Sequence, residues 1–370
     1  MNPRLIQLKP DAQPKAVSGE LTLLGQWPSA LKDERGRTLA FSLHPSSIPI
    51  DVERLRSIEG VSAVLGGMSP HPKVDALAHR IIEIAGHRFN QESPSTPLLI
   101  SGPCSVESES AVFAAARIVA EAGGQWLRGG AFKPRTSPYS FQGVGDDALR
   151  WMRDAADSHG LKVITEALSE RDVHAVAEWS DVVQIGTRNM QNFSLLKAVG
   201  STGAPTLLKR GLCATVEEWL LAGEYLMKHG SESVIFCERG LRGFDTQTRN
   251  LLDLGAVALL KHTYGLPIIV DPSHAVGRRD LIEPLSMAAM AVGADGVMVE
   301  AHPNAEQALS DGPQALDGAQ LKALGRRLGL TGPSRSIDSD SSESADEARL
   351  IPSPQPPQPS LLRRSPYVTP

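Results

Sequence analysis

Cysteine is scarce in this chain, and its scarcity excludes a fold built on disulfides. The three cysteines, Cys104, Cys213 and Cys237, are odd in number, lie far apart and form no Cys-x-x-Cys pair. Such a set is typical of reduced thiols in the cytoplasm, not of a secreted scaffold or a structural zinc site. The first residues also lack the apolar stretch of a secretory signal, so we expect a cytoplasmic protein.

Long hydrophobic runs and a large excess of one charge are absent as well. No stretch of about 18 apolar residues occurs, so we expect no membrane span. The formal net charge of −5 gives no general attraction to nucleic acid or to an anionic membrane. Hydrophobic residues make up 41% of the 370 residues, which is enough for a sizeable core.

Composition and pattern divide the chain into four parts. Residues 331–370 are rich in serine and proline and poor in apolar residues, so we expect a disordered tail. Asp75–His87 has the pattern of a linking helix, and we expect residues 76–96 to form a linker helix. Residues 1–75 predict a small α+β unit, with strands at Arg4–Leu8, Glu20–Leu24, Thr38–Leu43 and Val61–Leu65 and a helix at Asp51–Ile58.

Residues 97–330 alternate regularly between strand and helix patterns. Amphipathic stretches such as Ser108–Ala122, Asp146–His159 and Val216–His229 separate the strands, and Thr215 is a good cap for the last of these helices. Eight such repeats predict a (β/α)8 TIM barrel. A doubly wound open sheet is the main alternative, but no Gly-x-Gly-x-x-Gly opens a helix here. The expected strands are Leu98–Ile100, Trp126–Leu127, Lys162–Thr165, Val182–Ile185, Thr206–Leu208, Val234–Phe236, Ile268–Val270 and Val297–Val299.

Charged residues follow nearly every expected strand. Because a barrel gathers the carboxyl ends of its strands at one face, these residues predict a common site. The cations among them would repel one another unless anions shared the pocket, which favours phosphorylated and carboxylated small molecules. These cations are Arg128, Lys133, Arg135, Arg188, Lys209 and Arg239, and the hydroxyls of Thr136 and Ser137 lie beside them in the sequence.

A second group of strand-end residues is suited to metal binding. Cys104 follows the first strand, His274 the seventh and Glu300 the eighth, and Asp311 lies in the loop after the eighth. One thiolate, one imidazole and two carboxylates suit Mn²⁺, Fe²⁺, Co²⁺ or Zn²⁺. We interpret His302, which also follows the last strand, as an exposed loop residue.

Motifs throughout the barrel region resemble those of the 3-deoxy-D-arabino-heptulosonate-7-phosphate (DAHP) synthases, in particular their short bacterial branch. They are GPCSVES (102–108), GGAFKPRTSPYSFQG (129–143), QIGTRNMQN (184–192), LLKRG (207–211), ERG (238–240), DPSHAVGRRD (271–280) and VMVEAHPNAEQALSDGPQAL (297–316). The resemblance implies condensation of phosphoenolpyruvate with erythrose 4-phosphate, the first step of the shikimate pathway. It also implies a homo-oligomer, which we expect to be a dimer or a tetramer.

The resemblance also implies a role for each matching residue. Cys104, His274, Glu300 and Asp311 would bind the divalent metal. Arg135, Thr136 and Ser137 would hold the sugar phosphate, and Asp271 and Glu166 would lie close to the substrates. Lys133 is expected to pass a proton. Together with two of the metal ligands, Cys104 and His274, it forms the expected catalytic set. Phosphoenolpyruvate would be held by Arg128, Lys133, Arg188, Lys209 and Arg239, with Gly186 and Thr187 nearby.

Two alternative functions remain at this point. One is the related condensation by a 3-deoxy-manno-octulosonate-8-phosphate synthase, which uses arabinose 5-phosphate; the Lys133-Pro134-Arg135-Thr136 sequence favours the erythrose enzyme. The other is a non-catalytic sensor of phosphoenolpyruvate, which we would expect to have lost a ligand or a cation. The N-terminal region departs from the family's ferredoxin-like regulatory domain because a first helix is not evident, so we expect an incomplete version.

Overall fold

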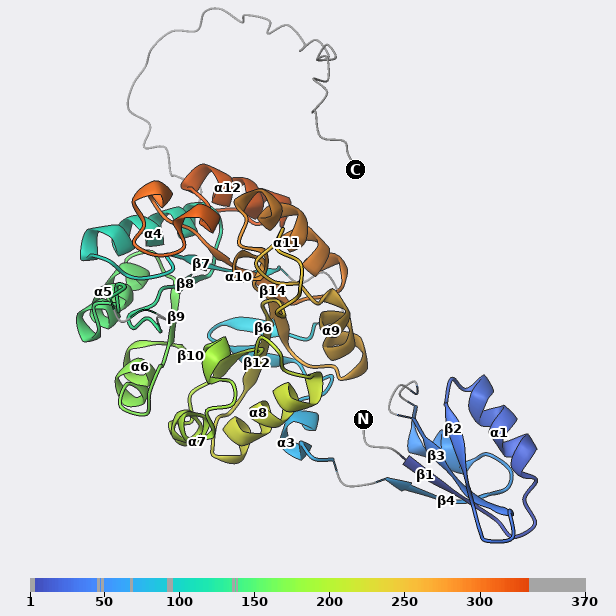
Figure 1. Ribbon diagram of the computed structural model, residues 1–370. Coiled ribbons are helices and arrows are strands. Elements are labelled where there is room, and N and C mark those ends of the chain that lie inside the picture. The colour runs from blue at the N-terminus through green and yellow to red at the C-terminus, as the bar shows by residue number, and fades with distance from the viewer. Residues whose placement is uncertain are drawn as a thin grey trace, which may run out of the picture. The chain divides into compact units, whose positions relative to one another are not determined.

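The computed structural model describes residues 4–44, 47, 50–66, 69–91, 96–134, 137 and 139–332. Apart from residues 331 and 332, the tail predicted to be disordered lies outside the described residues. Within them the strands form a four-stranded sheet, a two-stranded hairpin and a closed barrel (Figure 1).

The N-terminal sheet has the β-α-β-β-α-β order of a ferredoxin-like unit. Its strand order is β2-β3-β1-β4, and the neighbouring strands are antiparallel. Ile6 of β1 pairs with Phe41 of β3 and Val64 of β4, and these three buried residues pack with the helices. The elements are β1 (Arg4–Leu8), α1 (Pro14–Leu23), β2 (Pro28–Lys32), β3 (Thr38–Leu43), α2 (Val52–Arg56) and β4 (Val61–Gly66).

The strand predicted at Glu20–Leu24 is wrong, because these residues continue the helix α1. Val17 and Leu21 are both buried, and their spacing of four residues places them on one face of that helix. Pro14 lies in its first turn, where the missing amide hydrogen costs nothing. The apolar residues Leu21–Leu24 are too few to show the spacing of a helix, so by themselves they predict a strand. The sequence prediction therefore contains neither the helix α1 nor the strand β2.

The barrel confirms the predicted TIM fold. Each strand pairs in parallel with its neighbour in the chain, and β14 closes the ring against β7. The strands are β7 (Leu98–Gly102), β8 (Trp126–Arg128), β9 (Lys162–Glu166), β10 (Val182–Ile185), β11 (Thr206–Lys209), β12 (Val234–Glu238), β13 (Ile268–Val270) and β14 (Gly296–Glu300).

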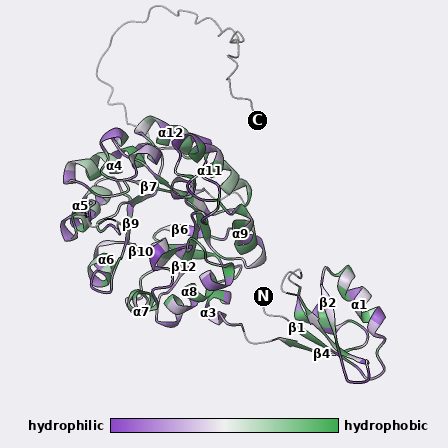
Figure 2. Ribbon diagram, in the orientation of Figure 1, coloured by the Kyte–Doolittle hydropathy of each residue, from purple (hydrophilic) through white to green (hydrophobic). Residues whose placement is uncertain are grey.

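Helices follow the strands and surround the barrel (Figure 1). Apolar residues of strands and helices form one large buried cluster between them, and in Figure 2 the helices carry both hydrophobic and hydrophilic colours. No helix among the described residues is long and apolar enough to cross a membrane. The helices are α4 (Glu109–Glu121), α5 (Asp146–Asp157), α6 (Val173–Trp179), α7 (Phe193–Ser201), α8 (Val216–Lys228), α9 (Leu254–Ala258), α10 (Pro272–Val276), α11 (Ile282–Ala291) and α12 (Gly318–Arg327).

The predicted helix cap at Thr215 is present, and α4 has a cap as well. Thr215 and Glu218 form a reciprocal capping box at the start of α8, and Ser108 accepts a hydrogen bond from the amide of Ala111 at the start of α4. These caps fix where the chain turns from each loop into its helix, and therefore how long the loops at the carboxyl ends of β11 and β7 can be.

The linker helix predicted at residues 76–96 is wrong. The short helix α3 (Pro72–Asp75) is followed by a hairpin of β5 (Ile82–Ile84) and β6 (His87–Phe89). Ala85 and Gly86 form its turn with φ of 47° and 76°, a left-handed geometry that a helix cannot contain. The buried side chains Ile84 and Phe89 join the cluster inside the barrel, so the burial of these two residues favours strands over a helix.

Candidate active site

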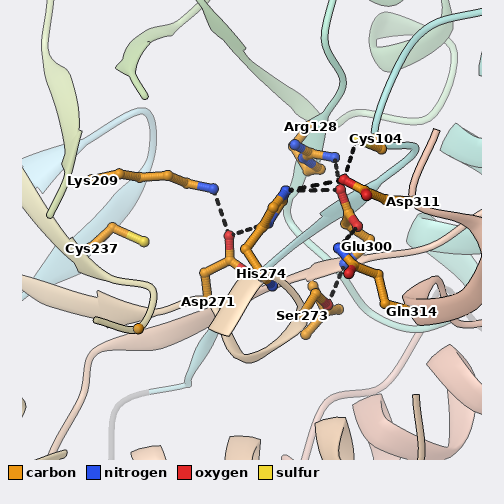
Figure 3. Close-up of polar contacts among 12 residues, drawn as sticks. Cys104, Arg128, Lys209, Cys237, Asp271, Ser273, His274, Glu300, Asp311 and Gln314 are labelled. Atoms are coloured by element: carbon orange, nitrogen blue, oxygen red, sulfur yellow. Dashed lines mark hydrogen bonds and ion pairs between the residues drawn. The ribbon is translucent and has the colours of Figure 1, made fainter. Parts of the chain in front are cut away.

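The four predicted metal ligands converge at the carboxyl ends of the barrel strands (Figure 3). One ligand atom from each of Cys104, His274, Glu300 and Asp311 lies within 4.8 Å of the others. Sγ of Cys104 lies 3.2 Å from Oδ2 of Asp311, and Nε2 of His274 lies 3.1 Å from Oε1 of Glu300. They come from the loop after β7, from α10, from the end of β14 and from the loop that follows it.

The donor set fits a divalent cation, and His274 is oriented to serve it. Asp271 caps α10 and accepts a hydrogen bond from Nδ1 of His274 at 2.7 Å, which leaves Nε2 facing the other ligands. Burial alone would lower the pKa of His274, but Asp271 and Glu300 outweigh it and raise this pKa to about 10. The carboxylates that attract a proton to this position would attract a metal cation in the same way.

Glu300 is fixed as an anion. Burial would raise its pKa, but His274 and the cations Arg128 and Lys133 hold it well below its usual range. Its backbone N–H donates to Oγ of Ser273 at 3.0 Å, and Nε2 of Gln314 donates to Oε2. These contacts leave Oε1 between Arg128 and His274, at 3.2 Å and 3.1 Å respectively.

Next to the ligand cluster is a cavity of about 510 Å³ with many cations in its wall. Arg128, Lys209 and Arg239 line it although each residue is at most 7% exposed. Nε of Arg128 and Nε of Arg239 are buried and have no hydrogen-bond partner among the described residues. Since buried charged groups require partners, these arginines are suited to an anion that enters the cavity.

Lys133 and Arg188 line the same cavity. Nζ of Lys133 donates to the carbonyl oxygen of Cys104 at 2.8 Å and lies 3.2 Å from its Sγ. Arg188 is exposed, and its guanidinium donates to the carbonyl oxygen of Pro134 at 3.1 Å. The lysine therefore lies between the ligand cluster and the cavity, and the arginine lies at the rim.

Gly186 lies where a side chain would not fit. A Cβ atom there would come within 1.9 Å of Oε1 of Glu166, which also lines the cavity. Thr187 follows with a buried hydroxyl that has no partner among the described residues, and Ser137 lies at the cavity wall. The predictions for Arg135 and Thr136 fall on positions outside the described residues.

Asp271, which is expected to lie close to the substrates, is held by hydrogen bonds to its neighbours. Its side chain is fully buried, and its carboxylate accepts hydrogen bonds from Lys209 at 2.5 Å and from the ring and backbone of His274. Burial would raise its pKa, but His274 and Lys209 hold it well below the usual range. Asp271 therefore links a cation of the cavity to a predicted metal ligand (Figure 3).

Sequence reasoning missed several residues of the cavity wall. Arg242, Arg249 and Asn250 belong to the long loop after β12, where no strand pattern marks them. Asn250 nevertheless donates to the carbonyl oxygen of His274 at 3.0 Å. Gln184 was treated only as part of a strand, although it also lines the cavity and its side chain donates to Glu166.

Comparison with known proteins agrees with this geometry. Residues 92–329 match the model of the DAHP synthetase I family. A phospho-2-dehydro-3-deoxyheptonate aldolase of Thermotoga maritima is 47% identical over 275 residues, which cover 74% of this chain and 80% of the relative. A 2-dehydro-3-deoxyphosphooctonate aldolase of Acidithiobacillus ferrooxidans is 32% identical over 250 residues, covering 62% of this chain and 87% of the relative.

Solved structures give the same result. The crystal structure of the Thermotoga maritima phospho-2-dehydro-3-deoxyheptonate aldolase (DAHP synthase) matches 90% of this chain and 99% of its own, with a TM-score of 0.67 and 39% identity. A truncated form of that organism's 3-deoxy-D-arabino-heptulosonate 7-phosphate synthase matches 69% of this chain and 95% of its own, with a TM-score of 0.62 and 44% identity. The chain therefore belongs to the DAHP synthetase I family.

Proposed function

We propose that this chain condenses phosphoenolpyruvate with erythrose 4-phosphate and water to give DAHP and inorganic phosphate, the first step of the shikimate pathway. The observation that carries the proposal is the convergence of four potential metal ligands with a wall of cations at one end of the barrel. Family membership and the 47% identical heptonate aldolase support this choice of reaction.

The cations supply the binding site for phosphoenolpyruvate. Arg128, Lys209 and Arg239 are buried, so water screens their charge less than it screens the charge of surface residues, and an anion in the cavity meets it at close range. Arg188 completes the phosphate site from the rim. As phosphate leaves, its growing charge is stabilised by groups that are already in place, which is the most effective form of electrostatic catalysis.

The ligand cluster holds a divalent cation, for which Mn²⁺, Fe²⁺, Co²⁺ and Zn²⁺ are the candidates. When bound, such an ion supplies Lewis acidity toward the aldehyde oxygen of the sugar phosphate. Cys104, His274, Glu300 and Asp311 provide its ligands, while Asp271 fixes the ring of His274. Holding both substrates in one cavity removes much of the entropy cost of bringing them together.

Lys133 is the group best placed to hold and move a proton. Its ammonium is anchored by the carbonyl oxygen of Cys104, and it lines the cavity beside the cations that bind phosphoenolpyruvate. An N–H directed from this position into the cavity would serve as a general acid toward a bound substrate.

Release of inorganic phosphate tests the proposal directly. Purified protein is incubated with phosphoenolpyruvate and Mn²⁺, together with either erythrose 4-phosphate or arabinose 5-phosphate. We expect phosphate release that requires both the metal and the four-carbon sugar. Turnover with arabinose 5-phosphate alone would assign the octulosonate reaction, and no turnover with either sugar would leave a phosphoenolpyruvate sensor.

A pair of cysteine variants provides the matched control for this assay. Cys104→Ala removes a ligand and should abolish turnover. Cys213→Ala changes an exposed thiol outside the ligand cluster and should leave turnover unchanged.

The remaining proposals concern the cellular location, the domain boundaries and the oligomeric state of the protein. We place it in the cytoplasm, since a thiolate ligand requires reducing conditions and all three cysteines are unpaired. We divide the chain into an N-terminal ferredoxin-like unit up to about residue 75, a connecting segment to residue 96, the catalytic barrel to residue 330 and the tail. A homo-oligomer, dimer or tetramer, stays a prediction that light scattering can measure.

A further inference from the structure

Asp311 lies well inside the loop that follows β14, eleven residues after the end of that strand. The loop after β14 returns on itself: the amide of His302 donates to the carbonyl oxygen of Leu316 at 2.9 Å, and the amide of Leu316 donates to that of Glu300 at 2.8 Å. Asp311 has a φ of 54°, a left-handed conformation that is unfavourable for a residue other than glycine. Its position therefore depends on whatever holds this part of the loop.

The segment that carries Cys104 supplies that support. Oε1 of Glu107 accepts a hydrogen bond from the backbone N–H of Leu309 at 2.6 Å. The hydroxyls of Ser105 and Ser310 are also in contact. These two contacts fix the residues that immediately precede Asp311 to the GPCSVES segment, so this segment provides one ligand directly and supports another.

His302 is a buried neighbour of Glu107. The prediction that His302 is exposed is wrong, because the residue is only 6% exposed. Its Nδ1 accepts a hydrogen bond from the amide of Asn304 at 3.0 Å, which places a ring proton on Nε2. Nε2 is buried without a hydrogen-bond partner among the described residues, and Oε2 of Glu107 at 3.8 Å is the carboxylate that it faces.

From these contacts we infer that Glu107 is a positioning residue of the metal centre, which holds Asp311 beside the other ligands through the loop that carries it. The inference rests on the proposed function, since it concerns the metal of that site. Glu107 lies outside the set of four ligands and does not line the cavity. It acts on the metal only through the loop that it anchors.

Metal affinity of the apoprotein tests the inference without reference to turnover. Co²⁺ is titrated into the apoprotein, and the absorption of the cobalt–thiolate pair at Cys104 reports binding. Glu107→Ala should weaken Co²⁺ binding about tenfold or more, the usual effect of losing a group that orients a ligand. Glu107→Gln keeps an oxygen for the amide of Leu309 and should lose less.

Glu109→Ala is the matched control, because Glu109 is an exposed glutamate two residues away in the first turn of α4. It should bind Co²⁺ like the wild type. A double-mutant cycle with Asp311→Ala separates positioning from a general loss of structure. Once Asp311 is absent, Glu107→Ala should have no further effect on the affinity for Co²⁺.

Two results would overturn the inference alone. In one, Glu107→Ala binds Co²⁺ as tightly as Glu109→Ala does. In the other, the affinity loss is the same with and without Asp311. A wild-type protein that binds no Co²⁺ would instead overturn the metal centre of the proposed function, and the inference with it.

Discussion

Replacement of Asp271 by asparagine should damage both metal binding and stability. Oδ2 of Asp271 accepts hydrogen bonds from Lys209 at 2.5 Å and from Nδ1 of His274 at 2.7 Å, and Oδ1 accepts one from the amide of His274 at 2.9 Å. Asparagine turns one of these two acceptors into an N–H₂ donor. Either orientation of the amide therefore sets a donor against a donor.

The size of the effect follows from the burial of this pair. Asp271 is fully buried and Lys209 is 4% exposed, so the substitution leaves a buried ammonium without its counter-ion. Removing one partner of a buried ion pair costs about 3–5 kcal/mol. His274 also loses the group that orients its ring, which should weaken metal binding about 10–100-fold.

Two assays and one control measure these effects. The control is Asp253→Asn, because Asp253 also pairs with a buried cation, Arg210 at 2.9 Å, and also caps a helix. Thermal unfolding should show a lower melting temperature for both variants. Titration of the apoprotein with Co²⁺ should show weaker binding for Asp271→Asn only. Equal Co²⁺ affinity in the two variants would refute the role given to Asp271.

Three further predictions concern separate parts of the molecule. Cys104→Ala should keep the far-ultraviolet circular dichroism of the wild type but lose Co²⁺ binding and turnover; full activity of this variant in the presence of EDTA would remove the metal from the reaction. Gly186→Ala should lower kcat/KM strongly and destabilise the fold by about 1–3 kcal/mol, because its Cβ overlaps the Glu166 carboxylate, and wild-type kinetics would contradict that packing. His71 is buried between Asp75 at 2.8 Å and Glu217 at 3.6 Å; burial lowers its pKa, but these carboxylates outweigh it and raise the pKa above 6.5. Its stabilising contribution is therefore complete below about pH 6.5 and is lost as the pH rises through the folded-state pKa. Urea unfolding should accordingly show a larger deficit for His71→Gln at pH 6 than at pH 9, and a constant deficit would contradict the ion-pair assignment.

The barrel was predictable from the sequence because its signal is repeated. Each strand is buried on both faces and reads as a short apolar run, and each helix shows its own period. Each apolar run is followed by residues at the carboxyl end of its strand, and in a barrel these ends lie at one face. The sequence therefore predicts Cys104, His274 and Glu300 at that face. For Asp311, which lies in an irregular loop, the strand pattern gives only a possible ligand, and the family resemblance adds support.

Other features depend on contacts that a linear pattern does not contain. The buried faces of Ile84 and Phe89 make residues 82–89 a hairpin, although their composition also allowed a helix. The sequence also did not indicate that three hydrogen bonds tie Asp271 to Lys209 and His274. The role proposed for Glu107 depends on the approach of two loops, and nothing in its local sequence indicates that approach.

The most direct test of the central claim is anomalous diffraction from a crystal soaked with Mn²⁺ and phosphoenolpyruvate. The account predicts one strong anomalous peak among Sγ of Cys104, Nε2 of His274 and carboxylate oxygens of Glu300 and Asp311, each within about 2.0–2.5 Å of the ion. It also predicts the phosphate beside Arg128, Lys209 and Arg239. A peak elsewhere, or phosphoenolpyruvate bound away from these cations, would contradict it.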